Sequence, residues 1–404
     1  MGPLNIPQFL GLLVLILAAA KLCGALAKFI GQPAVLGELV AGVILGNLAL
    51  VNPKNEVLHL LAELGVVILL FEIGLETDLR KLLKVGGAAT AVAIVGVALP
   101  FALGYAVCWM LGFGNLVAVV AGASLTATSV GITARVLSDL NRLQEPESQI
   151  ILGAAVIDDV IGLVILAVVA GLTEGTEVTV FGVAKTTAIA FGFLAGTLLV
   201  GRLVLPPLVR MASRIDLPGT PTMLAIMVAF GLAWLASVAG SALIIGAFAA
   251  GLLLRETPQA QEMERGVANL GHFFVPLFFV SVGAAVDLNV LNPLDPANRA
   301  TLMVGGLLII AAVAGKFIAG HAPIWFRGNK NVIGIGMIPR GEVGLIFAQM
   351  GLATGVFDAG LFSAVTLMVM VTTFMAPPLL KLLLPSRGTR QTPLDGIEGL
   401  VTDA

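Results

Sequence analysis

Two adjacent carboxylic acids, Asp158 and Asp159, stand in the middle of an otherwise apolar run, IILGAAVIDDVIGLVILAVV (150–169). An acidic side chain at the centre of a bilayer costs about 2.5–3.5 kcal/mol on insertion scales, so a pair of them indicates a function. Burial and a neighbouring like charge both favour the protonated acid, whereas a hard cation prefers carboxylate oxygens as ligands. A group that holds either a proton or a cation, but not both, can exchange one for the other.

A single cation stands in another apolar run, LLIIAAVAGKFIAG (307–320), which contains Lys316. Its long side chain could reach the membrane interface. A salt bridge to Asp158 or Asp159 would instead neutralise charges on both helices. The sequence therefore predicts that Lys316 is the salt-bridge partner of one of the two aspartates.

Hydroxyl side chains interrupt a third apolar run, GASLTATSVGITARVL (122–137), where Thr126, Thr128 and Ser129 lie between glycines. Glycine loosens a membrane helix, and hydroxyl and freed carbonyl oxygens are suitable ligands for a hard cation. Small residues are also common at helix contacts in membranes, so a pair of packing helices is the alternative interpretation.

A fourth run, GIGMIPRGEVGLIFAQMG (334–351), is interrupted by the segment from Pro339 to Glu342. A proline inside a span removes one helical hydrogen bond, and the adjacent glycine loosens the same region. Arg340 and Glu342 are predicted to form a structural pair at this break.

The elements that hold these residues must be membrane helices. Of the 404 residues, 58% are apolar and only 11% are charged, and the mean hydropathy is +1.04. Soluble domains carry about 25% charged residues, so a soluble protein is excluded. A net charge of −2 offers no basic surface for nucleic acid. The two cysteines and three histidines are scattered and predict neither a disulfide framework nor a metal site.

Breaking the apolar runs at their Pro, Gly and charged residues gives thirteen predicted spans. They lie near 7–27, 33–51, 57–76, 87–111, 115–138, 148–171, 179–204, 220–237, 240–254, 266–286, 301–320, 331–354 and 360–384. The predicted fold class is an all-α polytopic membrane protein. Residues 1–385 form the transmembrane domain and 386–404 a short cytoplasmic tail.

The positive charges predict the orientation. With the N-terminus outside, sixteen Lys and Arg residues fall on the cytoplasmic side and only three on the other side, which the positive-inside rule favours. The protein is therefore expected to be multi-pass in the plasma (inner) membrane, with its C-terminus in the cytoplasm.

An internal repeat joins the two halves. LGELVAGVIL (36–45) aligns without gaps on IGAFAAGLLL (245–254), and the same offset of 209 places 69–79 on 278–288. Seven spans separate the aligned segments, and an odd number reverses their direction in the membrane. The sequence thus predicts inverted-topology repeats at about 33–171 and 240–384, joined through a linker helix at about 179–204. Such repeats are typical of secondary transporters, whose binding sites lie where the repeats meet.

TATSVGITARVL (126–137), AAVIDD (154–159), the lone Lys316 and MIPRGEVGLI (337–346) together resemble the cation:proton antiporter-2 family, most closely its NapA-type bacterial sodium/proton antiporters. The resemblance covers about 30 to 385. It implies a homodimer of subunits with crossed discontinuous helices, and an elevator-like alternating-access cycle that exchanges Na⁺, or Li⁺, for protons. No cofactor and no enzymatic activity are implied.

Carried over to this sequence, the resemblance implies that Asp159 is the principal carboxylate for Na⁺ and protons. Asp158 would pair with Lys316 when no cation is bound. The crossing of the unwound helices would contain Thr126, Thr128, Ser129, Met337, Arg340 and Glu342. Related potassium-efflux systems carry a large nucleotide-binding regulatory domain, and none is expected here, which disfavours that branch. K⁺/H⁺ exchange remains the alternative within the family.

Three other classes compete with an antiporter. A sodium-coupled organic-anion symporter has crossed helices of similar design but does not need adjacent aspartates and a membrane lysine. An intramembrane aspartyl protease needs its two carboxylates on separate helices, whereas neighbours on one helix diverge by about 100°. An ion channel is less consistent with inverted repeats and interrupted helices than a carrier is.

Overall fold

The computed structural model describes residues 6–52, 55–173, 180–212, 219–286, 288 and 298–384, and over these the chain is helical without β-strands. Nine helices in this part of the chain are long and apolar enough to cross a membrane. They are α1 (Ile6–Phe29), α3 (Glu56–Glu76), α5 (Gly86–Met110), α8 (Pro146–Thr173), α9 (Val180–Ala212), α10 (Thr220–Val238), α12 (Ala260–Ala284), α13 (Asn298–Ala319) and α16 (Ala359–Leu383).

Shorter helices account for the remaining predicted spans. Two are single, α2 (Ala34–Asn47) and α11 (Leu243–Arg255). The other spans are broken into α6 (Asn115–Ser124) with α7 (Val130–Asp139), and α14 (Lys330–Gly336) with α15 (Glu342–Ala353). All thirteen predicted spans therefore correspond to helices, and the prediction of a polytopic all-α fold is confirmed. The predicted tail at 386–404 lies outside the described residues.

Two features differ from the sequence-based expectation. Helix α9 continues to Ala212, beyond the predicted end at 204, because a helix does not have to stop where its side chains leave the apolar layer. A short helix, α4 (Leu79–Lys84), was not predicted. Asp78 is its N-cap residue, and the Asp78 carboxylate accepts hydrogen bonds from the backbone N–H groups of Arg80 and Lys81.

The break between α6 and α7 has a local cause. Ser124 Oγ donates to the Val120 carbonyl over 2.9 Å, and Thr126 Oγ1 donates to the Ala123 carbonyl over 2.8 Å. Thr126 thereby bonds one of the last carbonyls of α6, which lack a helical partner, whereas a back-bond such as that of Ser124 to the carbonyl four residues before weakens and bends a helix. In the other broken span, Pro339 lacks the N–H group that would continue α14.

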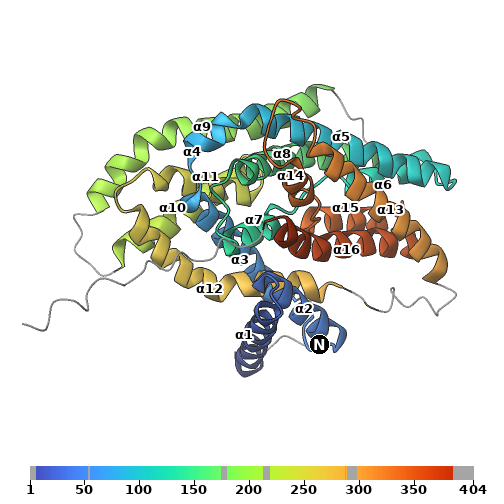
Figure 1. The fold of residues 1–404 in the computed structure, drawn as a ribbon, viewed down its shortest axis with the longest axis horizontal. Coiled ribbons are helices and arrows are strands. Elements are labelled where there is room, and N and C mark those ends of the chain that lie inside the picture. The colour runs from blue at the N-terminus through green and yellow to red at the C-terminus, as the bar shows by residue number, and fades with distance from the viewer. Residues whose placement is uncertain are drawn as a thin grey trace, which may run out of the picture.

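The helices form two groups that are visible on different sides of Figure 1. In one group α1 packs on α2, α2 on α12, α12 on α3, α3 on α11, and α11 on α10. In the other, α5 packs on α6, α8 and α13, and α13 packs on α16. We call them the scaffold group (α1–α3 and α10–α12) and the core group (α5–α8 and α13–α16). Helix α7 lies against α2 and α3, so it is part of the contact between the groups.

Close glycine contacts in the scaffold group obey the predicted repeat. A Cβ atom added to Gly283 would lie 2.1 Å from the Leu39 carbonyl oxygen, and one added to Gly74 would lie 2.4 Å from that of Phe248. Gly283 lies 209 residues after Gly74, and Phe248 lies 209 residues after Leu39. The glycine belongs to the second repeat in the first contact and to the first repeat in the second contact. This exchange is what an inverted repeat requires. Lipid tails give helices no hydrophobic reason to associate, so such close backbone packing stabilises the crossing.

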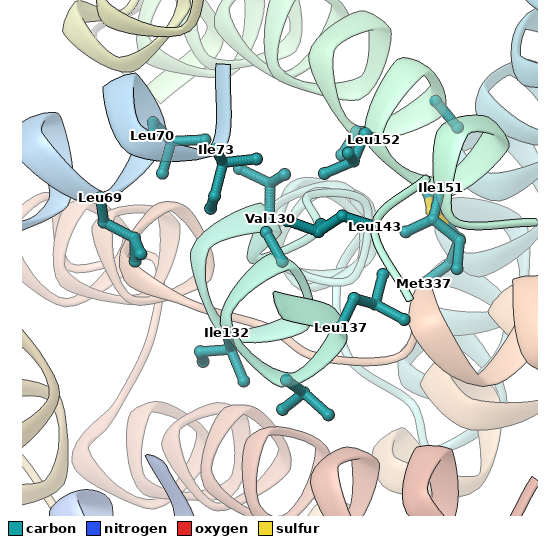
Figure 2. Packing of buried hydrophobic residues seen from close by; sticks show 14 of the residues in the cluster. Leu69, Leu70, Ile73, Val130, Ile132, Leu137, Leu143, Ile151, Leu152 and Met337 are labelled. Atoms are coloured by element: carbon teal, nitrogen blue, oxygen red, sulfur yellow. The ribbon is translucent and has the colours of Figure 1, made fainter. Parts of the chain in front are cut away.

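The apolar interior surrounds α7 (Figure 2). Figure 2 shows Val130, Ile132 and Leu137 of α7 among Leu69, Leu70 and Ile73 of α3 and Ile151 and Leu152 of α8, with Met337 nearby. This packing holds the second half of one broken span against α8. The same helix α8 carries the two aspartates, so the packing determines where the break lies relative to them.

Candidate ion-binding site

The aspartate pair lies within α8, where Asp158 is fully buried and Asp159 is 8% exposed. Neighbouring residues on one helix point in different directions, so the two carboxylates have different surroundings. Oδ2 of Asp158 accepts hydrogen bonds from Lys316 Nζ over 2.5 Å and from Thr128 Oγ1 over 2.7 Å. Its second oxygen, Oδ1, is buried and has no hydrogen-bond partner among the described residues.

Lys316 comes from α13 and is fully buried. Its ammonium group therefore does not reach the membrane interface, and the alternative of an interfacial lysine does not apply. The structure places the ammonium on Asp158, while on the side of α5 a Cβ added to Gly96 would lie 3.3 Å from Nζ. A buried charge that lost this partner would be uncompensated in a low-dielectric environment, which makes the pair strongly coupled.

The two broken spans cross next to this ion pair. The Ser129 backbone N–H donates to the Pro339 carbonyl over 2.8 Å, and Thr128 Oγ1 also lies 3.5 Å from the Met337 carbonyl oxygen. Thr128 thereby connects Asp158 with the crossing. Met337 is buried and presents this carbonyl at the end of α14.

Arg340 is the second buried cation of the site. Its guanidinium donates to the Ala127 carbonyl over 2.8 Å and to the Ala312 carbonyl over 3.4 Å. Thr373 Oγ1 of α16 in turn donates to the Arg340 carbonyl. Arg340 thus satisfies the Ala127 carbonyl at the first break and is also held against α13, while Thr373 satisfies the carbonyl of Arg340 itself at the second break. The predicted pair of Arg340 with Glu342 concerns a side chain outside the described part of the structure; the Glu342 backbone begins α15.

One polar residue of the crossing was not identified from the sequence. Thr133 Oγ1 of α7 donates to the Gly336 carbonyl over 2.6 Å. Gly336 and Ala127 are 209 residues apart, so Thr133 and Arg340 bond carbonyls at equivalent positions of the two repeats. A threonine one turn after the first break was the available signal, but its partner lies in the other repeat and cannot be recognised locally.

Thr126 is predicted at the crossing but has a different local role. Its hydroxyl bonds the Ala123 carbonyl of its own helix end, whereas Thr128 reaches Asp158. The structure therefore brings together Asp158, Lys316, Thr128, Ser129, Met337 and Arg340, and directs the Thr126 hydroxyl back to α6.

The electrostatics of the site follow from four ionisable side chains. In their ordinary forms Asp158 and Asp159 are negative, and Lys316 and Arg340 are positive, so the formal charges cancel. Among the described residues, no group of three or more His, Cys, Asp and Glu side chains could hold a metal ion. A cation at this site would use the carboxylates together with hydroxyl and carbonyl oxygens, which are the ligands that hard cations prefer.

The inverted repeats, the crossing of broken helices and the adjacent buried ion pair define a secondary transporter. The comparisons agree: residues 14–385 match the transmembrane sodium/hydrogen exchanger family, and the chain belongs to that family. The resemblance to the cation:proton antiporter-2 family is confirmed. The relatives support exchange of a monovalent cation for protons by a multi-pass membrane protein.

Two relatives cover nearly the whole chain. The high-affinity Na⁺/H⁺ antiporter NhaS3 of Synechocystis sp. is 42% identical over 94% of this chain and 90% of its own length. The Na⁺/H⁺-K⁺ antiporter GerN of Bacillus cereus is 35% identical over 93% of this chain and 96% of its own length. A solved structure, the sodium proton antiporter MjNhaP1 of Methanocaldococcus jannaschii, has a TM-score of 0.70 at 18% identity, covering 94% of this chain and 96% of the other. This structural likeness supports the fold.

Proposed function

We propose that this protein exchanges Na⁺, and also Li⁺, for protons by competition at Asp159 and Asp158. The observation that carries the proposal is the buried ion pair between Lys316 and Asp158 beside the crossing of the two broken spans. A cation that binds the carboxylates replaces the compensating charge of the ammonium. Protonation of the carboxylates removes the charge that holds the cation, so the two substrates exclude each other.

The two aspartates have different roles in this mechanism. Asp159 is proposed as the principal carboxylate because it is the one of the two that is not fully buried. Asp158 alternates between Lys316 and the cation, and its second oxygen, Oδ1, has no hydrogen-bond partner among the described residues. The Thr128 hydroxyl and the Met337 carbonyl supply neutral oxygen atoms near Asp158, and we propose that the Ser129 hydroxyl, next in the chain, adds another.

Arg340 has a supporting role in the proposed cycle. It is held by carbonyl groups of Ala127 and Ala312 rather than by a carboxylate, so it keeps its place when Lys316 leaves Asp158. The fixed guanidinium stabilises the Ala127 carbonyl that the first break exposes, and Glu342 begins the half-helix α15 after the second break. This keeps the crossing intact while the ions exchange.

Alternating access is proposed to occur by an elevator-like movement of the core group along the scaffold group. Within each group the helices pack closely, whereas the groups meet mainly where α7 lies against α2 and α3 and α16 lies against α2. Movement along this contact would carry Asp158 and Asp159 from one side of the membrane to the other. We further propose a homodimer in the plasma membrane, with the N-terminus outside and the C-terminus in the cytoplasm. The proposed repeats remain 33–171 and 240–384.

The test is cation-dependent proton release from proteoliposomes that contain the purified protein and a pH-sensitive dye. Na⁺, Li⁺ and K⁺ are added separately, and Asp159→Asn is compared with Glu63→Gln. Glu63 lies in α3 of the scaffold group and its side chain is 47% exposed, so its neutralisation controls for the loss of one carboxylate. The proposal expects a response to Na⁺ and Li⁺ that disappears in Asp159→Asn alone. A response to K⁺ only would favour K⁺/H⁺ exchange, and no response to any cation would contradict the proposal.

A further inference from the structure

A cavity of about 350 Å³ lies away from the ion pair, where the end of α3, the beginning of α4 and the end of α11 meet. In Figure 1 α4 is drawn next to α11. The cavity is lined by Asp78, Leu79, Arg80, Leu252, Arg255 and Glu256. Its arginines, Arg80 in α4 and Arg255 at the end of α11, lie on the side that the positive-inside rule predicts to be cytoplasmic. The proposed exchange mechanism does not use any of these residues.

The equivalent place in the first repeat, at the end of α2, is held by a pair of hydrogen bonds. There the Asn47 amide donates to the Val286 carbonyl over 2.7 Å and accepts from the Leu288 N–H over 3.0 Å. These two hydrogen bonds, which we call the Asn47 clamp, join the end of α2 to the residues that follow α12. With the offset of 209, the position of Asn47 is taken by Glu256, and that of Leu288 by Leu79. A carboxylate cannot donate to a carbonyl group, so an equivalent of the Asn47 clamp cannot form in the second repeat.

The preceding residue differs as well. Gly46 packs directly on the end of α12, since a Cβ atom there would lie 2.5 Å from the Ala284 carbonyl oxygen. Its counterpart is Arg255, and the counterpart of Ala284 is Leu75. In the second repeat the Arg255 side chain, rather than a close backbone contact, connects the two helix ends: its Nη1 donates to the Leu75 carbonyl. A close backbone contact at one end of the repeat is therefore replaced by a long cationic side chain and an open space at the other.

The hydrogen-bonding groups around the cavity favour an anion. Of the two acids, Glu256 pairs with Arg202 over 3.0 Å. Asp78 accepts from the backbone N–H groups of Arg80 and Lys81 but keeps its charge, so the two arginines Arg80 and Arg255 outnumber the one acid without a cationic partner among the described residues. Arg255 keeps further N–H donors besides the one on Leu75, and the Arg80 side chain is exposed at the rim. Guanidinium groups bind phosphate oxygens in bidentate geometry. We propose that this cavity binds a phosphate group, supplied by an anionic phospholipid head group or by free phosphate, between Arg80 and Arg255.

Binding to the purified protein tests this inference. The protein is delipidated in a neutral detergent, and its melting temperature is measured against dioctanoyl phosphatidylglycerol, inorganic phosphate and uncharged dioctanoylglycerol. The test variant is Arg80→Gln, because Arg80 has no part in closing the helix ends. The control is Lys84→Gln, which removes a positive charge from the same short helix α4 but does not line the cavity.

The expected result is a concentration-dependent rise in the wild-type melting temperature that Lys84→Gln retains. Arg80→Gln should weaken the apparent affinity at least about tenfold, as expected for the loss of a hydrogen bond between charged groups. A shift with phosphatidylglycerol alone identifies a lipid head group, and a shift with inorganic phosphate as well identifies the phosphate group itself.

A second variant reproduces the closed end of the repeat. R255G/E256N carries the residues of Gly46 and Asn47 at the equivalent positions and should no longer respond to either phosphate compound. The inference is overturned if the wild type shows no shift with phosphatidylglycerol or phosphate, or if Arg80→Gln responds with wild-type affinity. Retention of the full response by R255G/E256N would equally contradict it.

Discussion

Lys316 Nζ lies 2.5 Å from Asp158 Oδ2, and both side chains are fully buried although 158 residues separate them in the chain. Removing one partner of a buried pair leaves an uncompensated charge, which typically destabilises a protein by about 3–5 kcal/mol. We expect Lys316→Ala and Asp158→Asn each to lower the melting temperature in detergent. The double variant should lose clearly less stability than the sum of the two single losses, because no unpaired charge remains. Additive losses would assign Lys316 to another partner, first of all Asp159.

Asp159 is expected to be indispensable for exchange. Asp159→Asn keeps the size of the side chain but cannot release a proton or hold a cation with a charged oxygen. Cation-dependent proton release from everted vesicles should therefore be abolished at matched expression, while Glu63→Gln transports like the wild type. Wild-type transport by Asp159→Asn would place the exchanging carboxylate elsewhere.

The charge moved in each cycle is a further expectation. If both carboxylates and Lys316 take part, more than one proton should exchange for each monovalent cation. An imposed membrane potential should then shift the exchange equilibrium in proteoliposomes, since it acts on the net charge that crosses the membrane. An equilibrium that does not respond to the potential would leave one-for-one exchange.

The two threonines of the first break should differ in effect. Thr128→Val removes the hydroxyl that donates to Asp158 over 2.7 Å, whereas Thr126→Val removes one that bonds the end of its own helix. A hydrogen bond to a charged group contributes about 1.5–3 kcal/mol, which corresponds to a factor of about ten or more in an equilibrium constant. Thr128→Val should change the KM for Na⁺ by at least about this factor, and Thr126→Val should leave the KM near the wild-type value. Equal effects of the two changes would argue against a role of Thr128 at the ion site.

The glycine contacts of the scaffold group predict that equivalent substitutions in the two repeats both lower the stability of the protein. An added methyl group at Gly74 or Gly283 would overlap a backbone carbonyl of the facing helix, so Gly74→Ala and Gly283→Ala should each lower the melting temperature. Gly11→Ala is the matched control, because a Cβ atom there meets no atom within 4 Å. Alanine favours a helix more than glycine does, so Gly11→Ala should not destabilise the protein. A loss as large as that of the other two variants would contradict close packing as the cause.

Much of the architecture is determined by local properties of the chain. Hydropathy and the Pro, Gly and charged residues predict the thirteen spans, because every membrane-crossing segment must satisfy its own backbone. The two interrupted spans and the inverted repeat also follow from the sequence, since residues such as Gly74 and Gly283 recur at one fixed offset. The position of Asp158 and Asp159 within an apolar run is enough to predict that they belong to the functional site.

Only the tertiary structure decides which of these groups meet. It places Lys316 on Asp158, directs the Thr128 hydroxyl to the same carboxylate, and holds the Arg340 guanidinium on the Ala127 carbonyl of the other repeat. It also opens a cavity beside Arg255 where the equivalent position of the first repeat is closed by Asn47. Spans and breaks depend on neighbours within one helix, whereas these contacts depend on how distant helices cross and on which side chain reaches a particular carbonyl. That information is distributed over the whole packing and is absent from any single segment.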